Sequence, residues 1–83
     1  MTHYTSPAFW DFLDRLPVEI QDLAHRSYEL LRENPHHPSL HFKRIGGRWS
    51  VRVGLGYRAL GTDVEGGVLW VWIGSHAQYD RLI

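Results

Sequence analysis

The chain has 83 residues, enough for one small domain spanning residues 1–83 and too few for two, and its formal net charge is zero. Its 43% hydrophobic and 22% charged residues are typical of a folded domain, and the absence of cysteine excludes disulfides, thiolate metal sites and cysteine nucleophiles. Because the longest apolar run, Val68–Ile73, is far shorter than the ~20 residues of a membrane span and the N-terminus lacks signal-peptide features, we expect a cytoplasmic protein with no membrane partner.

Two helices are predicted in the first half of the chain. Ser6-Pro7 is a helix start, with serine as the N-cap and proline in the first turn. Pro17 ends this helix and opens a second one, which Asn34-Pro35 terminates. Apolar residues recur at helical spacing through both segments, at Phe9, Phe12, Leu13 and Leu16 and then at Ile20, Leu23, Ala24, Tyr28 and Leu31. The pattern predicts a tight helical hairpin.

Four strands are predicted in the second half. They are Ser39–Ile45, Arg48–Val53, Tyr57–Thr62 and Val68–Ile73, separated by glycine-containing turns. The expected fold is α+β, with the helical hairpin packed on one face of a four-stranded antiparallel sheet. Residues 1–4 are compatible with an additional edge strand, and the tail Gly74–Ile83 is expected to be short and polar, with Tyr79 as one of its anchors.

The zero net charge conceals an uneven distribution. Residues 34–62 contain five cations and no acid, whereas residues 1–33 carry six acids and three arginines, and residues 63–83 carry three acids and one arginine. The five cations are Lys43, Arg44, Arg48, Arg52 and Arg58. This asymmetry indicates either an anion-binding sheet face or a solvated face whose arginines pair with acids of the helices.

No metal or cofactor motif stands out, because His36, His37 and His41 lie around a proline-bounded loop without a nearby carboxylate. The residues instead suit acid–base chemistry on a phosphate, which needs a proton carrier and cations around the non-bridging oxygens. Arg52 and Arg58 lie on consecutive strands, and His76 and Tyr79 follow the last strand. The same residues also fit plainer roles, with His76 as a surface or capping residue and Tyr79 as a packing anchor.

Four segments resemble the RelE/ParE toxin superfamily of type II toxin–antitoxin systems, and the resemblance covers nearly the whole chain. They are Pro35–Lys43 with its Pro-Ser-Leu-His-Phe-Lys, Trp49–Gly54, the Tyr57-Arg58-Ala59-Leu60 hairpin strand, and Trp70–Asp80 with its Gly-Ser-His. The resemblance implies a microbial-RNase-like fold of two helices on a four-stranded antiparallel sheet, in agreement with the pattern of elements.

RelE-like members are implied to be ribosome-dependent mRNA endoribonucleases without a metal or other cofactor, in which a ribose 2′-hydroxyl attacks the adjacent phosphate. Carried over by position, the implied catalytic residues are Arg58, which contacts the scissile phosphate, Arg52, His76 and Tyr79. The implied nucleic-acid-binding residues are His41, Lys43, Arg44 and Arg48. The implied partners are a cognate antitoxin protein and mRNA on the ribosome.

Two other functions fit the same resemblance. A ParE-type toxin shares the fold and is implied to poison DNA gyrase without cutting RNA. A non-toxic interaction module would also share the fold, and the neutral charge, unusual among strongly basic RelE-like nucleases, favours it. Ser50 stands at a strand position where some nucleases have lysine. Arg52, Arg58 and His76 together favour the nuclease.

Overall fold

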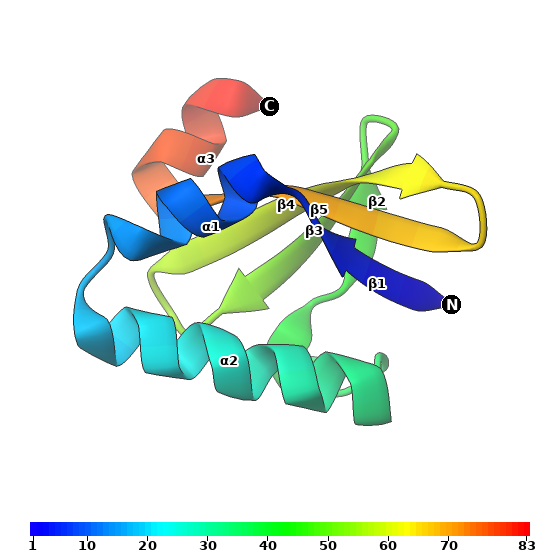
Figure 1. The fold of residues 1–83 in the computed structure, drawn as a ribbon, viewed down its shortest axis with the longest axis horizontal. Helices are drawn as coiled ribbons and strands as arrows, with labels where there is room; N and C mark the ends of the chain where they lie inside the picture. The colour runs from blue at the N-terminus through cyan, green and yellow to red at the C-terminus, as the bar shows by residue number, and fades with distance from the viewer.

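The computed structural model describes residues 1–83 and contains one mixed sheet with three α-helices. The elements are β1 (Thr2–Thr5), α1 (Pro7–Asp14), α2 (Val18–Glu33), a 3₁₀ turn η1 (Pro38–Leu40), β2 (Lys43–Ile45), β3 (Arg48–Val53), β4 (Tyr57–Val64), β5 (Gly67–Ser75) and α3 (His76–Leu82). The sheet order is β1-β5-β4-β3-β2. Figure 1 shows α2 across one side of the sheet and α3 on the opposite side. No helix has the length and apolar character needed to cross a bilayer.

The helical hairpin predicted from sequence is confirmed. The Ser6 hydroxyl accepts a hydrogen bond from the Phe9 amide at 3.2 Å, which caps α1 where the Ser-Pro pair predicts its start. Pro17 takes the N-cap position of α2, and Asn34 ends that helix with its amide bonded to the Leu30 carbonyl. Proline therefore sets both the joint between the helices and, through Pro35, the end of the second.

The sheet has the four expected strands and a fifth, β1, which lies at the edge where residues 1–4 were compatible with an additional strand and pairs in parallel with β5. A four-residue strand gives little signal in the sequence, and its ladder comes from a segment at the other end of the chain. The Thr2 amide donates to the Gly66 carbonyl at 3.1 Å, and the Ser6 amide donates to the Trp70 carbonyl at 3.0 Å. A side chain on Gly67 would collide with the Thr2 backbone, so glycine is what lets β1 approach.

Two other boundaries differ from the sequence prediction. Residues 38–40 form the 3₁₀ turn η1 instead of extended strand, since Pro38 lacks an amide donor and the His37 ring accepts from the Ser39 amide at 3.2 Å. The tail, expected to be short and polar with no helix assigned to it, forms α3 from His76, and Tyr79 is buried as an anchor. The capping box of α3 joins Ser75 and Gln78, whose side chains each accept from the other residue's amide, at 3.2 and 3.0 Å.

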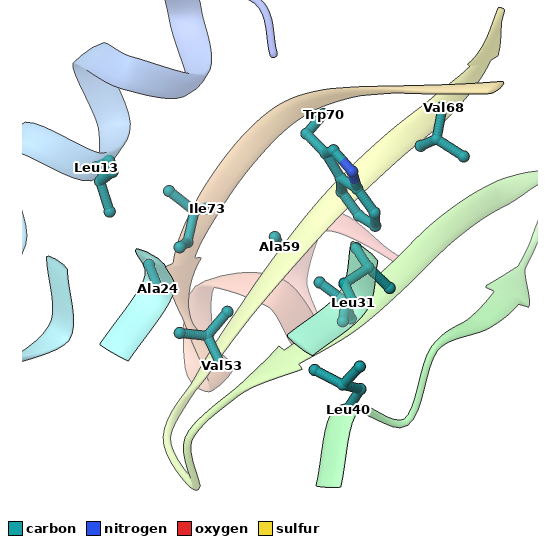
Figure 2. Close-up of a cluster of buried hydrophobic side chains, with 10 residues drawn as sticks. Leu13, Ala24, Leu31, Leu40, Val53, Ala59, Val68, Trp70 and Ile73 are labelled. Atoms are coloured by element: carbon teal, nitrogen blue, oxygen red, sulfur yellow. The ribbon is translucent and has the colours of Figure 1, made fainter. Parts of the chain in front are cut away.

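The hydrophobic core lies between α2 and the facing side of the sheet (Figure 2). Its buried members are Leu13, Ala24, Leu31, Leu40, Val51, Val53, Ala59, Val68, Trp70 and Ile73. Trp70 is 2% exposed, and its indole N–H donates to Nδ1 of His3 at 3.1 Å, which satisfies a polar group inside the core. Alternation along β3 places Arg48 and Arg52 on the face opposite Val51 and Val53. These two arginines therefore lie away from the core.

Replacing Gly67 with alanine tests the docking of β1. We expect Gly67→Ala to lower the free energy of unfolding by about 1–3 kcal/mol, because the new methyl group forces β1 and β5 apart. Gly56→Ala is the matched control, since a Cβ there meets no atom within 4 Å, and we expect a change within about 0.5 kcal/mol. Urea unfolding of both variants makes the comparison, and equal stability of the two would contradict the parallel pairing.

Candidate functional site

The β3–β4 hairpin places two arginines side by side. Arg52 and Arg58 are direct partners in the antiparallel register, so both side chains project from the same face. Like charges directly opposite repel each other. The ion pairs in the structure are Arg32–Glu29, Arg44–Asp63 and His76–Asp80, and none of them involves Arg52, Arg58 or Arg48. The hairpin therefore presents positive charge without a protein counter-ion, as an anion-binding site requires.

The first turn of α3 is fixed to the same hairpin. The His76 amide donates to the carbonyl of Gly56, in the β3–β4 turn, at 2.8 Å. The capping box between Ser75 and Gln78 sets where the helix begins. Gly74, the direct partner of Arg58 across β4 and β5, has no room for a side chain beneath the Trp72 ring and Gln78. These local features bring α3 down beside Arg58.

Arg58 is the centre of the resulting cluster. Its Nε–H donates to Nδ1 of His76 at 3.2 Å, and its guanidinium carbon lies 5.2 Å from the ring centre of Tyr79. Its Nη1 atom is buried and has no hydrogen-bond partner. A buried guanidinium nitrogen without a partner is costly unless a ligand or water supplies an acceptor. The buried Nη1 atom faces the interior of the cluster, and any phosphate would have to be met by the part of the guanidinium that stays exposed beside His76.

The contacts of His76 assign its tautomer. Arginine remains protonated, so its Nε–H requires a lone pair on Nδ1 of His76. The ring proton of neutral His76 then lies on Nε2, which is 3.5 Å from an Asp80 carboxylate oxygen one helical turn away. An imidazole held in this way can accept a proton at Nδ1 when Arg58 turns toward a ligand.

Tyr79 lies beneath both of these side chains. It is 3% exposed, its ring stacks on His76 with centroids 5.9 Å apart, and its hydroxyl is buried with no hydrogen-bond partner. The sequence interpretation placed Tyr79 among the catalytic residues. In the structure its ring supports Arg58 and His76, and its hydroxyl does not face solvent.

Ser50 belongs to this face and was not among the expected site residues. It shares the face with Arg52 through strand alternation, is 0% exposed, and has a buried hydroxyl without a partner. The strict alternation of Arg48, Ser50 and Arg52 could have placed Ser50 on this face. The burial of Ser50 could not be predicted from the sequence, because it depends on how the surrounding elements pack.

The predicted nucleic-acid-binding residues divide into two groups. Lys43 is the direct partner of Ser50, so it lies with Arg48 and Arg52 on the site face. His41 follows η1 with a left-handed backbone at φ 45°. The pKa of His41, an exposed residue, is lowered mainly by the Arg52 guanidinium and then by desolvation and by the charges of Arg58 and Lys43.

Arg44 lies outside this cluster, which corrects its expected grouping with Lys43 and Arg48. It is the direct partner of Trp49, and its guanidinium lies 4.5 Å from the Trp49 ring centre. Asp63 accepts from Arg44 at 2.7 Å with both oxygens and from the Trp49 indole at 2.9 Å, and these hydrogen bonds lower the pKa of Asp63. Asp63 lies one residue beyond the acid-free segment, so the sequence count did not reveal this pair.

No group of three or more histidine, aspartate or glutamate side chains is arranged to hold a metal ion. The cluster itself offers two arginine forks for phosphate oxygens and one imidazole for proton transfer.

The sequence and the fold were compared with known proteins. The model of the ParE-like toxin domain family matches residues 18–81. The RelB–RelE antitoxin–toxin complex of Methanococcus jannaschii contains a chain with a TM-score of 0.72 and 16% identity, covering 96% of this chain and 99% of that one. The RelBE2 toxin–antitoxin complex of Mycobacterium tuberculosis gives a TM-score of 0.66 at 21% identity, covering 92% and 91%. The YoeB/ParE toxin of Agrobacterium tumefaciens gives 0.66 at 15% identity, covering 92% and 99%. No curated protein sequence matches.

The buried hydroxyl of Tyr79 generates a stability prediction. We expect Tyr79→Phe to be as stable as the original protein or up to about 1 kcal/mol more stable, because it removes an unpartnered buried polar group. Tyr79→Ala should lose about 3–5 kcal/mol, since it leaves a cavity under Arg58 and His76. Urea unfolding measures both, and a loss of more than about 1 kcal/mol in Tyr79→Phe would show that the hydroxyl has a partner.

Proposed function

Since the chain belongs to the ParE-like toxin domain family of RelE/ParE toxins, we propose that it is a toxin that cleaves messenger RNA on the ribosome. The observation that carries the proposal is the position of Arg58. Its guanidinium contacts His76 and Tyr79 and lies opposite Arg52, and neither arginine is in an ion pair. This arrangement supplies cations for a scissile phosphate next to a group that can transfer a proton.

In the proposed reaction the ribose 2′-hydroxyl attacks the adjacent phosphorus. A base takes the hydroxyl proton as the new P–O2′ bond forms, and the P–O5′ bond breaks as an acid protonates the leaving oxygen. The products are a 2′,3′-cyclic phosphate and a free 5′-hydroxyl. Arg52 and Arg58 stabilise the negative charge that grows on the non-bridging oxygens. His76 is one of the two proton carriers, as acid or as base.

The requirement for the ribosome is supported by the charge of the chain. Proteins that bind RNA through its phosphates depend on cations, and their affinity grows with the number of contacts. With zero net charge, this chain has little long-range attraction for free RNA. A ribosome would present the mRNA in place, so that the few cations of the site suffice.

A ParE-type action on DNA gyrase is the second candidate. It is favoured by the matching family model, which describes a ParE-like toxin domain. It makes no use of the contact between Arg58 and His76. The two candidates therefore differ in what substitution of these residues does.

The catalytic prediction follows from these roles. We expect Arg58→Ala to reduce mRNA cleavage by about 10²–10³-fold and His76→Ala by about 10²–10⁴-fold. Arg58→Lys should retain part of the activity, because it keeps the charge but loses the bidentate fork. Arg32→Ala is the matched control, since Arg32 pairs with Glu29 on α2, across the sheet from the site, and should cleave normally.

The measurement is mapping of mRNA 5′ ends after induced expression, with and without translation, alongside growth arrest and circular dichroism of each variant. Folded Arg58→Ala and His76→Ala proteins that still cleave would refute the nuclease mechanism. Growth arrest with a DNA-damage response and no cleavage would establish the gyrase target, and a protein with no effect on growth would establish an interaction module.

The proposed partner is a cognate antitoxin, as in the solved complexes from Methanococcus jannaschii and Mycobacterium tuberculosis. A candidate surface lies between α1 and α2, where Trp10 is 43% exposed. Its indole N–H is held by the Thr5 hydroxyl at 3.1 Å, and its ring lies 6.0 Å from that of His25. An apolar cavity opens beside it, lined by Thr5, Phe9, Trp10, Leu13, Ala24, His25 and Tyr28.

We expect Trp10→Ala to weaken binding of the antitoxin by about 30-fold or more, as is usual for an exposed tryptophan at the centre of an interface. Growth arrest in the absence of antitoxin should be unchanged, because Trp10 lies outside the arginine cluster. Co-purification with the protein encoded by the neighbouring gene, followed by titration calorimetry, measures the effect. Unchanged affinity would exclude this surface.

A further inference from the structure

We propose that phosphate binding at the arginine cluster is coupled to protonation of His41, which thereby becomes the third cation around the bound anion. The inference rests on the proposed function only in taking a nucleic-acid phosphodiester as the ligand. It assigns to His41 the role of a proton-binding contact to the phosphate, next to Lys43 on β2, Arg52 on β3 and Arg58 on β4.

The backbone holds His41 at the rim of the site. Leu40, at the end of η1, is 1% exposed and anchors the chain in the core, and β2 begins at Lys43. Between them His41 takes a left-handed conformation, with φ at 45°, which is uncommon for a residue with a side chain. Such a conformation persists only where the surrounding structure determines it, and such residues cluster at functional sites.

The charged groups around His41 are all cationic. His41 precedes Lys43 by two residues, and Lys43 is the direct partner of Ser50, so the chain at His41 runs toward Arg52, two residues beyond Ser50. The cations that lower the pKa of His41 are Arg52 first and then Arg58 and Lys43, and none of them is in an ion pair. From α2, Arg26 lines a cavity together with Leu40 and Arg52, which adds a further cation near this edge. Asp80 is the nearest acid of α3 to Arg58, and it is paired with His76.

This environment has a direct consequence for protonation. The neighbouring cations hold the pKa of His41 below its ordinary value of 6.5, so the empty site favours a neutral imidazole. A phosphate bound between Arg52 and Arg58 would cancel that repulsion and raise the pKa. By reciprocity, protonated His41 binds the phosphate more tightly than neutral His41 by the same factor. Affinity should therefore be highest at low pH and fall as pH rises through the pKa of the bound state.

The test uses a 2′-O-methylated hexauridylate, which cannot be cleaved through its 2′-oxygen and has phosphodiesters that do not titrate near neutrality. Histidine Cε1–H signals are followed by NMR from pH 5 to 8, with and without this probe, and His41 is assigned from the His41→Gln variant. We expect the pKa of His41 to rise on binding, and the Kd to increase by at most about tenfold per pH unit as pH rises.

Two variants separate His41 from the other histidines. The His41→Gln variant should bind the probe with a Kd that no longer rises with pH. His3→Gln is the matched control. The pKa of His3 is also lowered, by burial and then by the charges of the N-terminus and Arg32, but its ring stacks on Trp70 on the other side of the sheet from the arginine cluster. Glutamine can still accept from the Trp70 indole, so the pH dependence of binding should persist.

Three results would overturn the proposal. If the probe binds and the pKa of His41 does not move, the coupling is absent while the phosphate site stands. If His41→Gln keeps the full pH dependence and the His76 signal shifts instead, the coupled proton belongs to His76. If the probe, supplied at millimolar concentration because a neutral chain attracts free RNA only weakly, does not bind at any pH, the coupling and the phosphate site at Arg52 and Arg58 are both refuted, whereas cleavage on the ribosome is decided separately by the mapping of mRNA 5′ ends.

Discussion

The hydrogen bond from the His76 amide to the Gly56 carbonyl joins the end of β5 to the turn between β3 and β4. Without it, α3 would be a short helix held by a few contacts at the end of a strand. With it, His76 and Tyr79 are placed over the hairpin that carries Arg52 and Arg58. Because an isolated seven-residue helix is unstable in water, α3 depends on this tie and on the capping box beside it.

The two faces of the sheet differ in packing and in how their buried polar atoms are hydrogen-bonded. On the α2 side, apolar side chains pack closely and the polar atoms find partners, as the Trp70 indole does with His3. On the α3 side, three buried polar groups, Ser50, Arg58 and Tyr79, lack partners. A folded protein tolerates a few such groups, and here they lie on the face that also carries the cations without ion-pair partners.

Local signals in the sequence predicted most of the fold. Serine and proline marked the helix ends, and strict alternation marked β3. The structure of β1 could not be predicted in this way, because its ladder is supplied by β5. The capping box of Ser75 and Gln78 was a readable signal for α3, but seven residues fall below the usual length of a helix.

The candidate site was predictable in outline only. Strand alternation alone placed Arg52 and Arg58 on one face. Alternation puts Arg44 on the same sheet face as Phe42, so its separation from Lys43 could be predicted, whereas its ion pair with Asp63 could not. The burial of Ser50 and of the Tyr79 hydroxyl depends on how α3 and the sheet pack, and no spacing in the sequence reports that. The roles of the site residues stay predictions.

The parallel pairing of β1 with β5 has a consequence for how the chain acquires its activity during synthesis. Thr2 must wait for Gly67 before it has a partner, and the groups around Arg58 come from segments between His41 and Tyr79. Contacts between segments so far apart in sequence form late in folding, because closing the intervening loop costs entropy. A chain interrupted before Tyr79 would lack the ring that supports Arg58 and His76, so the arginine cluster takes its final form only after α3 has been synthesised.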